Sequence, residues 1–357
     1  MEQNTIRVGI IGFGLAGQTF HAPLVRATPG LAITAVASSN PAKVHAALGE
    51  PVTVLDDPRA LATSALVDLV VIASPNATHF ELAALALGAG KHVVVDKPFT
   101  PTVAEAEQLA VMADERGLVL SVFHNRRWDS STLTVEKLLA AGTLGSVRHA
   151  AIHFDRFRAQ PQARWKEDAA ADGGTWMDLG PHLLHEALHY FGWPLAIQAD
   201  LASLRPGSRA DDCVQARLRY ADGLRVDVAA SMLTAAPRPR VALYGTRGSY
   251  VKQHLDTQEA TLKTGLLPGA DAAAWGIDPE QGMLSIEANG TVKASAIATE
   301  NGAYQEYYRR LRDAILGRGP NPVPPAQAIA VMRLLEAGRR SHAERREIEL
   351  DPIAQQI

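Results

Sequence analysis

Short apolar runs alternate with stretches of helical spacing through the first third of the chain. The apolar runs predict buried strands at residues 6–14, 31–39, 52–55, 66–75, 92–96 and 118–123. The spacing between them predicts helices at residues 15–27, 41–49, 78–90 and 102–117. Continuous apolar strands that alternate with helices are typical of a parallel sheet covered on both faces. Residues 1–123 are therefore predicted to form a doubly wound, Rossmann-like α/β domain.

The pattern changes after about residue 145. Apolar and polar positions alternate in several segments, which predicts strands with one solvated or partner-facing side. These segments are residues 146–157, 195–204, 211–221, 224–233 and 240–252. Helical spacing returns at residues 174–191, 303–317 and 325–342. Residues 124–357 are therefore predicted to form an α+β domain with a mostly antiparallel sheet.

The composition narrows the class of protein. The chain has 357 residues, 47% of them hydrophobic and 20% charged, with a net charge of −3. This balance predicts a soluble globular protein and gives no reason to expect a nucleic acid or an anionic membrane as partner. The single cysteine excludes a disulfide within the chain. The apolar runs do not reach membrane length and the first residues lack a signal-peptide pattern, so we expect a cytoplasmic protein.

A glycine-rich turn follows the first predicted strand and opens the first predicted helix. It has the pattern G-x-G-x-x-G, formed by Gly12, Phe13, Gly14, Leu15, Ala16 and Gly17. In this context the glycines allow a tight turn, close approach of the backbone to a pyrophosphate, and helix packing on the strand. The pyrophosphate would lie at the helix N-terminus. The alternative is a glycine-rich turn without a ligand, which the strand–helix–strand context disfavours.

The end of the second predicted strand bears on the choice between NADP and NAD. Ser38, Ser39 and Asn40 stand where an NAD site usually has Asp or Glu to bind the ribose 2′-hydroxyl. Small hydroxyl side chains leave room for a 2′-phosphate, and Lys43 could add positive charge. We therefore expect NADP (NADPH), with NAD as the alternative. Ser39 or Asn40 could also simply cap the helix that starts at residue 41.

Polar residues also follow the fourth, fifth and sixth predicted strands. Ligands bind at this carboxyl edge in open α/β sheets, so we expect cofactor contacts there. The expected contacts are Ser74, Pro75, Asn76, His79, Asp96, Lys97 and Asn125. His124 is a further candidate for the shell around the site.

A second motif points to different chemistry. His185, Glu186 and His189 form H-E-x-x-H, the pattern of a helical zinc site in metalloproteases. Two histidines four residues apart could bind one ion, and the glutamate could act as base. The sequence offers no identifiable third ligand, and the pattern arises easily by chance. We therefore expect no metal site.

The residues around that motif resemble the sequence patterns of a known protein family. The stretch DGGTWMDLGPHLLHEALHYFGW has the pattern Gly-Gly-x-x-x-Asp-x-Gly-x-His, and an Asp-Lys-Pro sequence precedes it in the chain. Together they resemble the Gfo/Idh/MocA family of nicotinamide-dependent sugar and inositol oxidoreductases. The runs THFELAALALGAGKHVVVDKPFT and SVFHNRRWDS look similar to a subgroup that contains NADP-dependent scyllo-inositol dehydrogenases. The resemblance covers almost the whole chain, although the family usually has Glu-Lys-Pro at the lysine.

The resemblance implies roles for three residues. Lys97 would orient and polarise the reacting oxygen, Asp178 would be its acidic partner, and His182 would be the acid/base. An aromatic and basic pair near the nicotinamide would correspond to Arg164 and Trp165. His185 stands where the family often has a further Asp that contacts the substrate.

The implied reaction interconverts a secondary alcohol and a ketone of a cyclic polyol or sugar. The alternatives are an aldose 1-dehydrogenase, a reductase of another small carbonyl compound, and a non-catalytic NADP-binding sensor. A homo-oligomer, either a dimer or a tetramer, is the family expectation.

Overall fold

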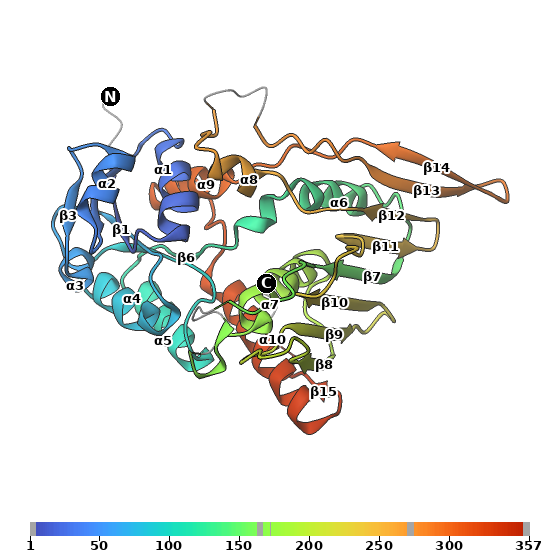
Figure 1. Cartoon of the computed structure of the whole chain (residues 1–357). Helices are drawn as coiled ribbons and strands as arrows, with labels where there is room; N and C mark the ends of the chain where they lie inside the picture. The colour runs from blue at the N-terminus through green and yellow to red at the C-terminus, as the bar shows by residue number, and fades with distance from the viewer. Residues whose placement is uncertain (1–4, 163–166, 172, 270–274, 353–357) are drawn as a thin grey trace. The chain divides into compact units, whose positions relative to one another are not determined.

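The computed structural model describes residues 5–162, 167–171, 173–269 and 275–352. The chain folds into two compact units, each assembled from three segments of sequence. The first unit comprises residues 1–128, 257–276 and 303–329, and the second comprises residues 129–256, 277–302 and 330–357. Many of their elements are labelled in Figure 1.

The first unit is built on a six-stranded parallel sheet. Its strands are β1 (Ile6–Ile11), β2 (Leu31–Ala37), β3 (Thr53–Leu55), β4 (Leu69–Ile72), β5 (His92–Val95) and β6 (Leu120–Val122). Their order is β3-β2-β1-β4-β5-β6, and every pair is parallel. The predicted Rossmann-like sheet is confirmed. Because the order reverses between β1 and β4, the loops that follow these two strands flank the place where such sheets bind ligands.

Helices lie between these strands, and one short helix follows β6. They are η1 (Gly17–His21), α1 (Ala22–Arg26), α2 (Pro41–Leu48), α3 (Pro58–Ala62), η2 (Asn76–Thr78), α4 (His79–Gly88), α5 (Val103–Glu115) and η3 (Asn125–Trp128). Local sequence fixes where several begin. Thr102 and Glu105 form a reciprocal capping box at the start of α5, which satisfies two backbone N–H groups. The sequence pattern missed α3, which has only five residues.

The last third of the chain contributes to the first unit through α8 (Gln258–Lys263) and α9 (Gln305–Ile315). Tyr307 and Tyr308 of α9 are fully buried, and the Tyr307 ring meets Phe123 edge-on with centroids 4.9 Å apart. The backbone at Val323 also accepts a hydrogen bond from the N–H of Val122 in β6. The compact units therefore differ from the predicted division at residue 123. The reason is that these later residues bury their apolar side chains against β6 and α1.

The second unit contains a nine-stranded sheet. Its strands are β7 (Val147–His153), β8 (Ala196–Ala202), β9 (Cys213–Arg219), β10 (Arg225–Ser231), β11 (Val241–Gly245), β12 (Gly248–Lys252), β13 (Gly282–Ala288), β14 (Thr291–Ile297) and β15 (Ile348–Glu349). The order is β14-β13-β12-β11-β7-β10-β9-β8-β15. The β7–β10 pair is parallel, and the other neighbouring pairs are antiparallel. The predicted mostly antiparallel sheet is confirmed.

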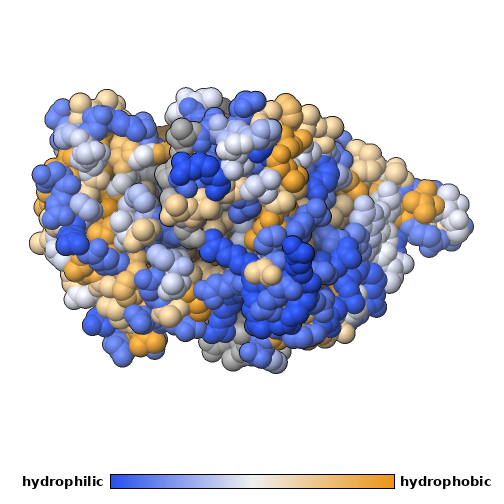
Figure 2. Space-filling view, turned by 60° about the horizontal axis from the view of Figure 1, so that its bottom comes forward, coloured by the Kyte–Doolittle hydropathy of each residue, from blue (hydrophilic) through white to orange (hydrophobic). Residues whose placement is uncertain are grey.

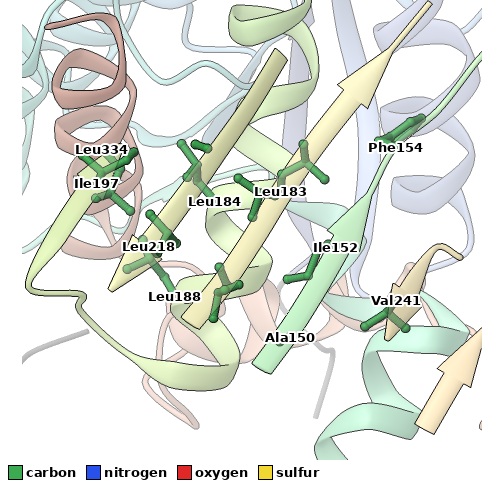
Figure 3. Close-up of a cluster of buried hydrophobic side chains, with 14 of the residues drawn as sticks. Ala150, Ile152, Phe154, Leu183, Leu184, Leu188, Ile197, Leu218, Val241 and Leu334 are labelled. Carbon is green, nitrogen blue, oxygen red and sulfur yellow. The ribbon is translucent and has the colours of Figure 1, made fainter. Parts of the chain in front are cut away.

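The core of this unit lies between its sheet and helix α7 (Thr175–Phe191), which packs on β7, β9 and β10. Leu183, Leu184 and Leu188 of α7 point toward the sheet and belong to one buried cluster with Ile152 and Leu218 (Figure 3). Other helices of the unit are α6 (Ser130–Ala140) and α10 (Pro325–Glu344), whose first residues belong to the first unit. Burial of this apolar surface, at about 25 cal/mol per Å², fixes the orientation of α7 and of its polar side chains.

On the face shown in Figure 2, hydrophilic residues are interspersed with small apolar areas, as on ordinary water-exposed surfaces. Within the described ranges, no helix combines the length and apolar character needed to cross a bilayer.

Candidate functional site

The glycine-rich turn has the conformation that its sequence predicts. Gly12 directly follows β1 with φ of +92°, and a Cβ atom there would lie 2.7 Å from the carbonyl oxygen of Ala73. A Cβ atom on Gly17 would lie 2.1 Å from the carbonyl oxygen of Gly12. Both contacts exclude a side chain, so these two glycines let the first helix pack against the turn. The turn and helix are continuous with β1, as a dinucleotide cradle requires.

Gly14 differs from its two neighbours. It is exposed, and apart from its chain neighbours no atom of the described residues lies within 4 Å of the position that its Cβ atom would occupy. The backbone at Gly14 therefore faces open space, into which a side chain would project. This is the arrangement expected where a pyrophosphate group approaches the backbone closely. The turn thus fits a dinucleotide.

We expect the variant Gly14→Ala to keep its stability and to lose cofactor affinity. The new methyl group meets no other part of the described structure, so the melting temperature should stay within about 2 °C of the parent. Its place is where the pyrophosphate would lie, so NADPH should bind at least about tenfold more weakly, or ~1.4 kcal/mol. Protein fluorescence titrated with NADPH measures this. Gly88→Ala is the matched control, because Gly88 in α4 also faces open space. Equal affinity of both variants would contradict the assignment.

The residues after β2 have two different roles: one caps helix α2, and another brings a positive charge to the glycine turn. The side-chain oxygen of Asn40 accepts a hydrogen bond from the N–H of Lys43, so Asn40 is the N-cap of α2. Ser38 accepts a hydrogen bond from the N–H of Asn40, and Ser39 is exposed. The ammonium group of Lys43 donates to the carbonyl oxygen of Phe13 at 3.0 Å. The capping alternative is thus confirmed for Asn40, and Lys43 brings a positive charge to the glycine turn.

Asp96 and Lys97 follow β5 at the carboxyl edge of the sheet. The Oδ1 atom of Asp96 accepts a hydrogen bond of 2.7 Å from the backbone N–H of Lys97. After β4, Asn76 is buried, and its side-chain oxygen has no hydrogen-bond partner among the residues that the structure describes. A buried polar atom of this kind costs free energy unless a ligand or water satisfies it. Asn76 therefore fits a residue that binds a polar group of the cofactor.

His79 lies between the loops after β4 and β5. Its ring nitrogen Nδ1 is 2.9 Å from the carbonyl oxygen of Pro98, and Nε2 is 3.0 Å from the carbonyl oxygen of Ser74. The ring is almost fully buried. These contacts place His79 behind the two loops, where it holds their backbones together. Pro75, between Ser74 and Asn76, is exposed.

His124 and Asn125 follow β6 and are both buried. Burial lowers the pKa of His124 to about 3, and the positive charges of Arg127 and Lys97 add to this effect. His124 is therefore a neutral imidazole near pH 7. A neutral ring at this edge can accept or donate a hydrogen bond but adds no positive charge to the site.

In the second unit, the glycine pair Gly173–Gly174 before α7 allows a close approach to another segment. Gly174 has φ of +123°, and a Cβ atom there would lie 2.3 Å from Oδ1 of Asp211. The Asp211 carboxylate accepts a hydrogen bond of 2.6 Å from the N–H of Trp176 in the first turn of α7. Burial raises the pKa of Asp211, although this hydrogen bond opposes the change. Asp211 therefore anchors the helix start that precedes Asp178.

Asp178 and His182 are four residues apart on α7, so their side chains project from one face of the helix. Asp178 is partly buried, and the ring of His182 stacks on Phe154 with centroids 6.1 Å apart. A cavity of about 10 Å³ adjoins Asp178, Thr175 and Asp211, which is room for about one water molecule. Helix packing thus holds both predicted catalytic side chains of this unit in place. Arg164 and Trp165 lie outside the described residues.

Sequence patterns did not find Asp211 or Arg205. The Arg205 guanidinium is buried and bonds Asp212 and Glu167, at 3.0 Å each, beside the same small cavity. Neither residue belongs to a local motif. They lie more than twenty residues from Asp178 in the sequence, so only the fold brings them to the start of α7.

The H-E-x-x-H motif has structural partners in this unit. Glu186 forms a buried ion pair with Arg240 and accepts a hydrogen bond from the hydroxyl of Tyr190 at 3.0 Å. His189 pairs with Glu136. The carboxylate that a zinc mechanism needs as base is therefore engaged by a guanidinium. Across the described residues, no group of three or more His, Cys, Asp or Glu side chains could hold a metal ion.

Comparison with known proteins finds a matching family model for part of each unit. Residues 6–124 match the model for an oxidoreductase family with an NAD-binding Rossmann fold. Residues 132–251 match the model for the GFO/IDH/MocA C-terminal domain.

Individual relatives cover nearly the full chain. The uncharacterised oxidoreductase YdgJ of Escherichia coli is 48% identical, over 96% of this chain and 98% of its own. The scyllo-inositol 2-dehydrogenase (NADP(+)) IolW of Bacillus subtilis is 34% identical, over 98% of this chain and 97% of its own. An oxidoreductase structure from Yersinia pestis, at 46% identity, superposes with a TM-score of 0.93 over 98% of this chain and 99% of its own. The glycine turn, the sheet order, the strand-end lysine and the helix with Asp178 and His182 therefore have one explanation: this chain belongs to the Gfo/Idh/MocA family of NAD(P)-binding oxidoreductases.

Proposed function

We propose that this protein is an NADP-dependent oxidoreductase that interconverts a secondary alcohol and a ketone of a cyclic polyol or sugar. A scyllo-inositol dehydrogenase is the specific activity that we propose. The proposal rests on two features found at one edge of the first unit's sheet. The open glycine turn follows β1 and the Asp96–Lys97 pair follows β5, so both lie at the carboxyl edge of that sheet. The relative IolW, which carries that enzyme name, supports the substrate class.

The preference for NADP is inferred from charge at the glycine turn. The residues Ser38 and Ser39 after β2 carry no carboxylate that would repel a 2′-phosphate. The ammonium group of Lys43 lies 3.0 Å from the carbonyl oxygen of Phe13 in the turn itself. An ammonium ion in this position would attract a phosphate, while a ribose 2′-hydroxyl would gain much less from it.

The proposed chemistry divides among three side chains. When bound, the nicotinamide cofactor supplies the hydride chemistry. During oxidation, His182 takes the proton of the substrate hydroxyl group, because an ordinary histidine titrates near neutral pH. Lys97 donates a hydrogen bond to the same oxygen and stabilises the negative charge that develops there. Asp178 balances the positive charge of the lysine and orients the donors.

Turnover of a polyol panel tests this function. We expect scyllo-inositol and related cyclic polyols to reduce NADP⁺, followed by nicotinamide absorbance, with kcat/KM at least about tenfold above the value with NAD⁺. Lys43→Met should reduce this cofactor preference several-fold, since it removes the charge that favours the 2′-phosphate. Lys137→Met is the control, because Lys137 pairs with Glu300 in the second unit.

The same panel separates the alternatives. Lactone formation from an aldose would indicate an aldose 1-dehydrogenase, and reduction of other small carbonyl compounds would indicate a reductase. Tight NADPH binding without turnover of any compound would indicate a sensor and would contradict the proposed enzyme. A preference for NAD⁺ would contradict the role of Lys43.

A further inference from the structure

Asp96 lies at the centre of a cluster of ionisable side chains in the first unit. Its Oδ1 atom holds the backbone N–H of Lys97, and its Oδ2 atom lies 3.8 Å from Nε2 of His21. This second separation is beyond an ordinary hydrogen bond, so the His21–Asp96 contact is electrostatic. The groups that act on Asp96 or respond to its charge come from five elements or strand ends. They are His21, His79, Lys97, His124, Tyr307 and Tyr308.

His21 is a fully buried histidine that the proposed function does not use. Its Nδ1 atom lies 2.7 Å from the hydroxyl oxygen of Tyr308, and its ring packs on Phe123 with centroids 4.2 Å apart. Its Nε2 atom is buried and has no hydrogen-bond partner among the described residues. A buried polar ring has a cost in an aromatic core unless a specific contact offsets it. The carboxylate of Asp96 is the charged group that faces Nε2.

The hydroxyl of Tyr308 at Nδ1 and the carboxylate of Asp96 near Nε2 together favour the tautomer of His21 that has its hydrogen on Nε2. Burial raises the pKa of Tyr308 well above its usual value, so this residue keeps its proton at neutral pH. A protonated phenol can donate to Nδ1, which leaves the ring hydrogen on Nε2 and directed toward Asp96. If the ring is instead cationic, Nε2 also carries hydrogen. In both cases a positive or partly positive group faces the carboxylate.

Asp96 stays ionised in this environment. Burial raises its pKa, but the facing His21 ring and the charges of Lys97 and His79 outweigh burial, so the net pKa lies below the usual value. An ionised carboxylate is a strong acceptor for the backbone N–H of Lys97. The orientation of Asp96 therefore helps to fix the position of the Lys97 backbone, from which the Lys97 side chain projects.

We propose that His21 and Tyr308 are positioning residues for Lys97. Tyr308 orients His21, and His21 attracts one oxygen of Asp96 electrostatically. The other oxygen of Asp96 accepts the hydrogen bond from the backbone N–H of Lys97. This inference rests on the proposed function for the role of Lys97, but the contacts themselves do not. The proposal gives helix α9 a role besides packing, because its residue Tyr308 would influence the position of Lys97 through His21 and Asp96.

Tyr308→Phe tests the proposal, since it removes a single hydroxyl group and keeps the ring. We expect NADPH affinity and the KM for the polyol to stay within about twofold, while kcat falls about five- to twentyfold. Tyr307→Phe is the matched control. Tyr307 is equally buried on α9, but its hydroxyl donates to Ser121 at 2.9 Å rather than to His21. The control should keep kcat within twofold.

Nitrogen-15 NMR of the histidine rings gives a second readout that does not depend on turnover. In the parent protein, Nε2 of His21 should carry hydrogen. Its signals should shift in Tyr308→Phe and in Asp96→Asn, and stay unchanged in Tyr307→Phe. His21 signals unaffected by both substitutions would overturn the proposal, as would a lower melting temperature of Tyr308→Phe with kcat unchanged. Shifted His21 signals in a protein that oxidises no polyol would support the contacts and count against the proposed function alone.

Discussion

Replacement of Lys97 by methionine is expected to lower kcat about 10²- to 10³-fold and to leave NADPH affinity within about threefold. Methionine keeps the length of the side chain and removes its charge and its hydrogen-bond donors. Loss of one donor to a developing oxyanion typically has an effect of this size. Cofactor affinity should survive, because the glycine turn and Asn76 lie in other loops of the same edge. Nicotinamide absorbance measures turnover, and fluorescence titration measures NADPH binding.

Lys91→Met is the matched control for this experiment. Lys91 precedes β5 and Lys97 follows it, so the two lysines flank opposite ends of one strand. The control should retain kcat within about twofold of the parent. If Lys97→Met also retained its turnover, the role assigned to Lys97 would be wrong. If it lost NADPH affinity to the same extent as kcat, Lys97 would be a cofactor-binding residue and not a catalytic one.

The parts of the fold that could be predicted are those where burial leaves a local pattern. β4 and the three valines of β5 are buried on both faces of the sheet, so they form continuous apolar runs that stand out in the sequence. β14 is exposed along almost its whole length and therefore has no alternation of buried and exposed positions. Helix α6 begins with serine and threonine residues that are buried, which hides its helical spacing. Both elements escaped the sequence pattern for this reason.

Residues of the candidate site could likewise be predicted only where a local sequence pattern marks them. Gly12, Gly17 and Gly174 could be assigned because each stands next to the turn that needs it. The contact of His21 with Tyr308 joins residues 287 positions apart, and no local spacing contains it. Asp211 reaches the start of α7 from 35 residues away. Side chains that support a site from behind are fixed by tertiary packing, so their sequence positions carry no motif.

Replacement of His182 by asparagine is expected to lower kcat/KM for polyol oxidation about 10²- to 10⁴-fold, the usual contribution of a general base. In the parent, kcat/KM should rise with pH as a neutral base forms, and then level off. Asparagine cannot take the proton, so the variant should lose this part of the pH dependence. His189→Asn is the control, because His189 on the same helix pairs with Glu136. An unchanged pH profile in His182→Asn would assign the base to another residue.

The double variant Lys97→Met/His182→Asn tests whether the two side chains serve one reacting oxygen. Lys97 belongs to the first unit and His182 to the second, so independent roles would make their free-energy losses add. If the lysine stabilises charge on the oxygen from which the histidine takes the proton, removal of either group leaves the other with little to act on. The double variant should then lose much less than the product of the two single losses. Full additivity would show that the two residues act in separate steps, and the proposed division of proton transfer and charge stabilisation would have to be abandoned.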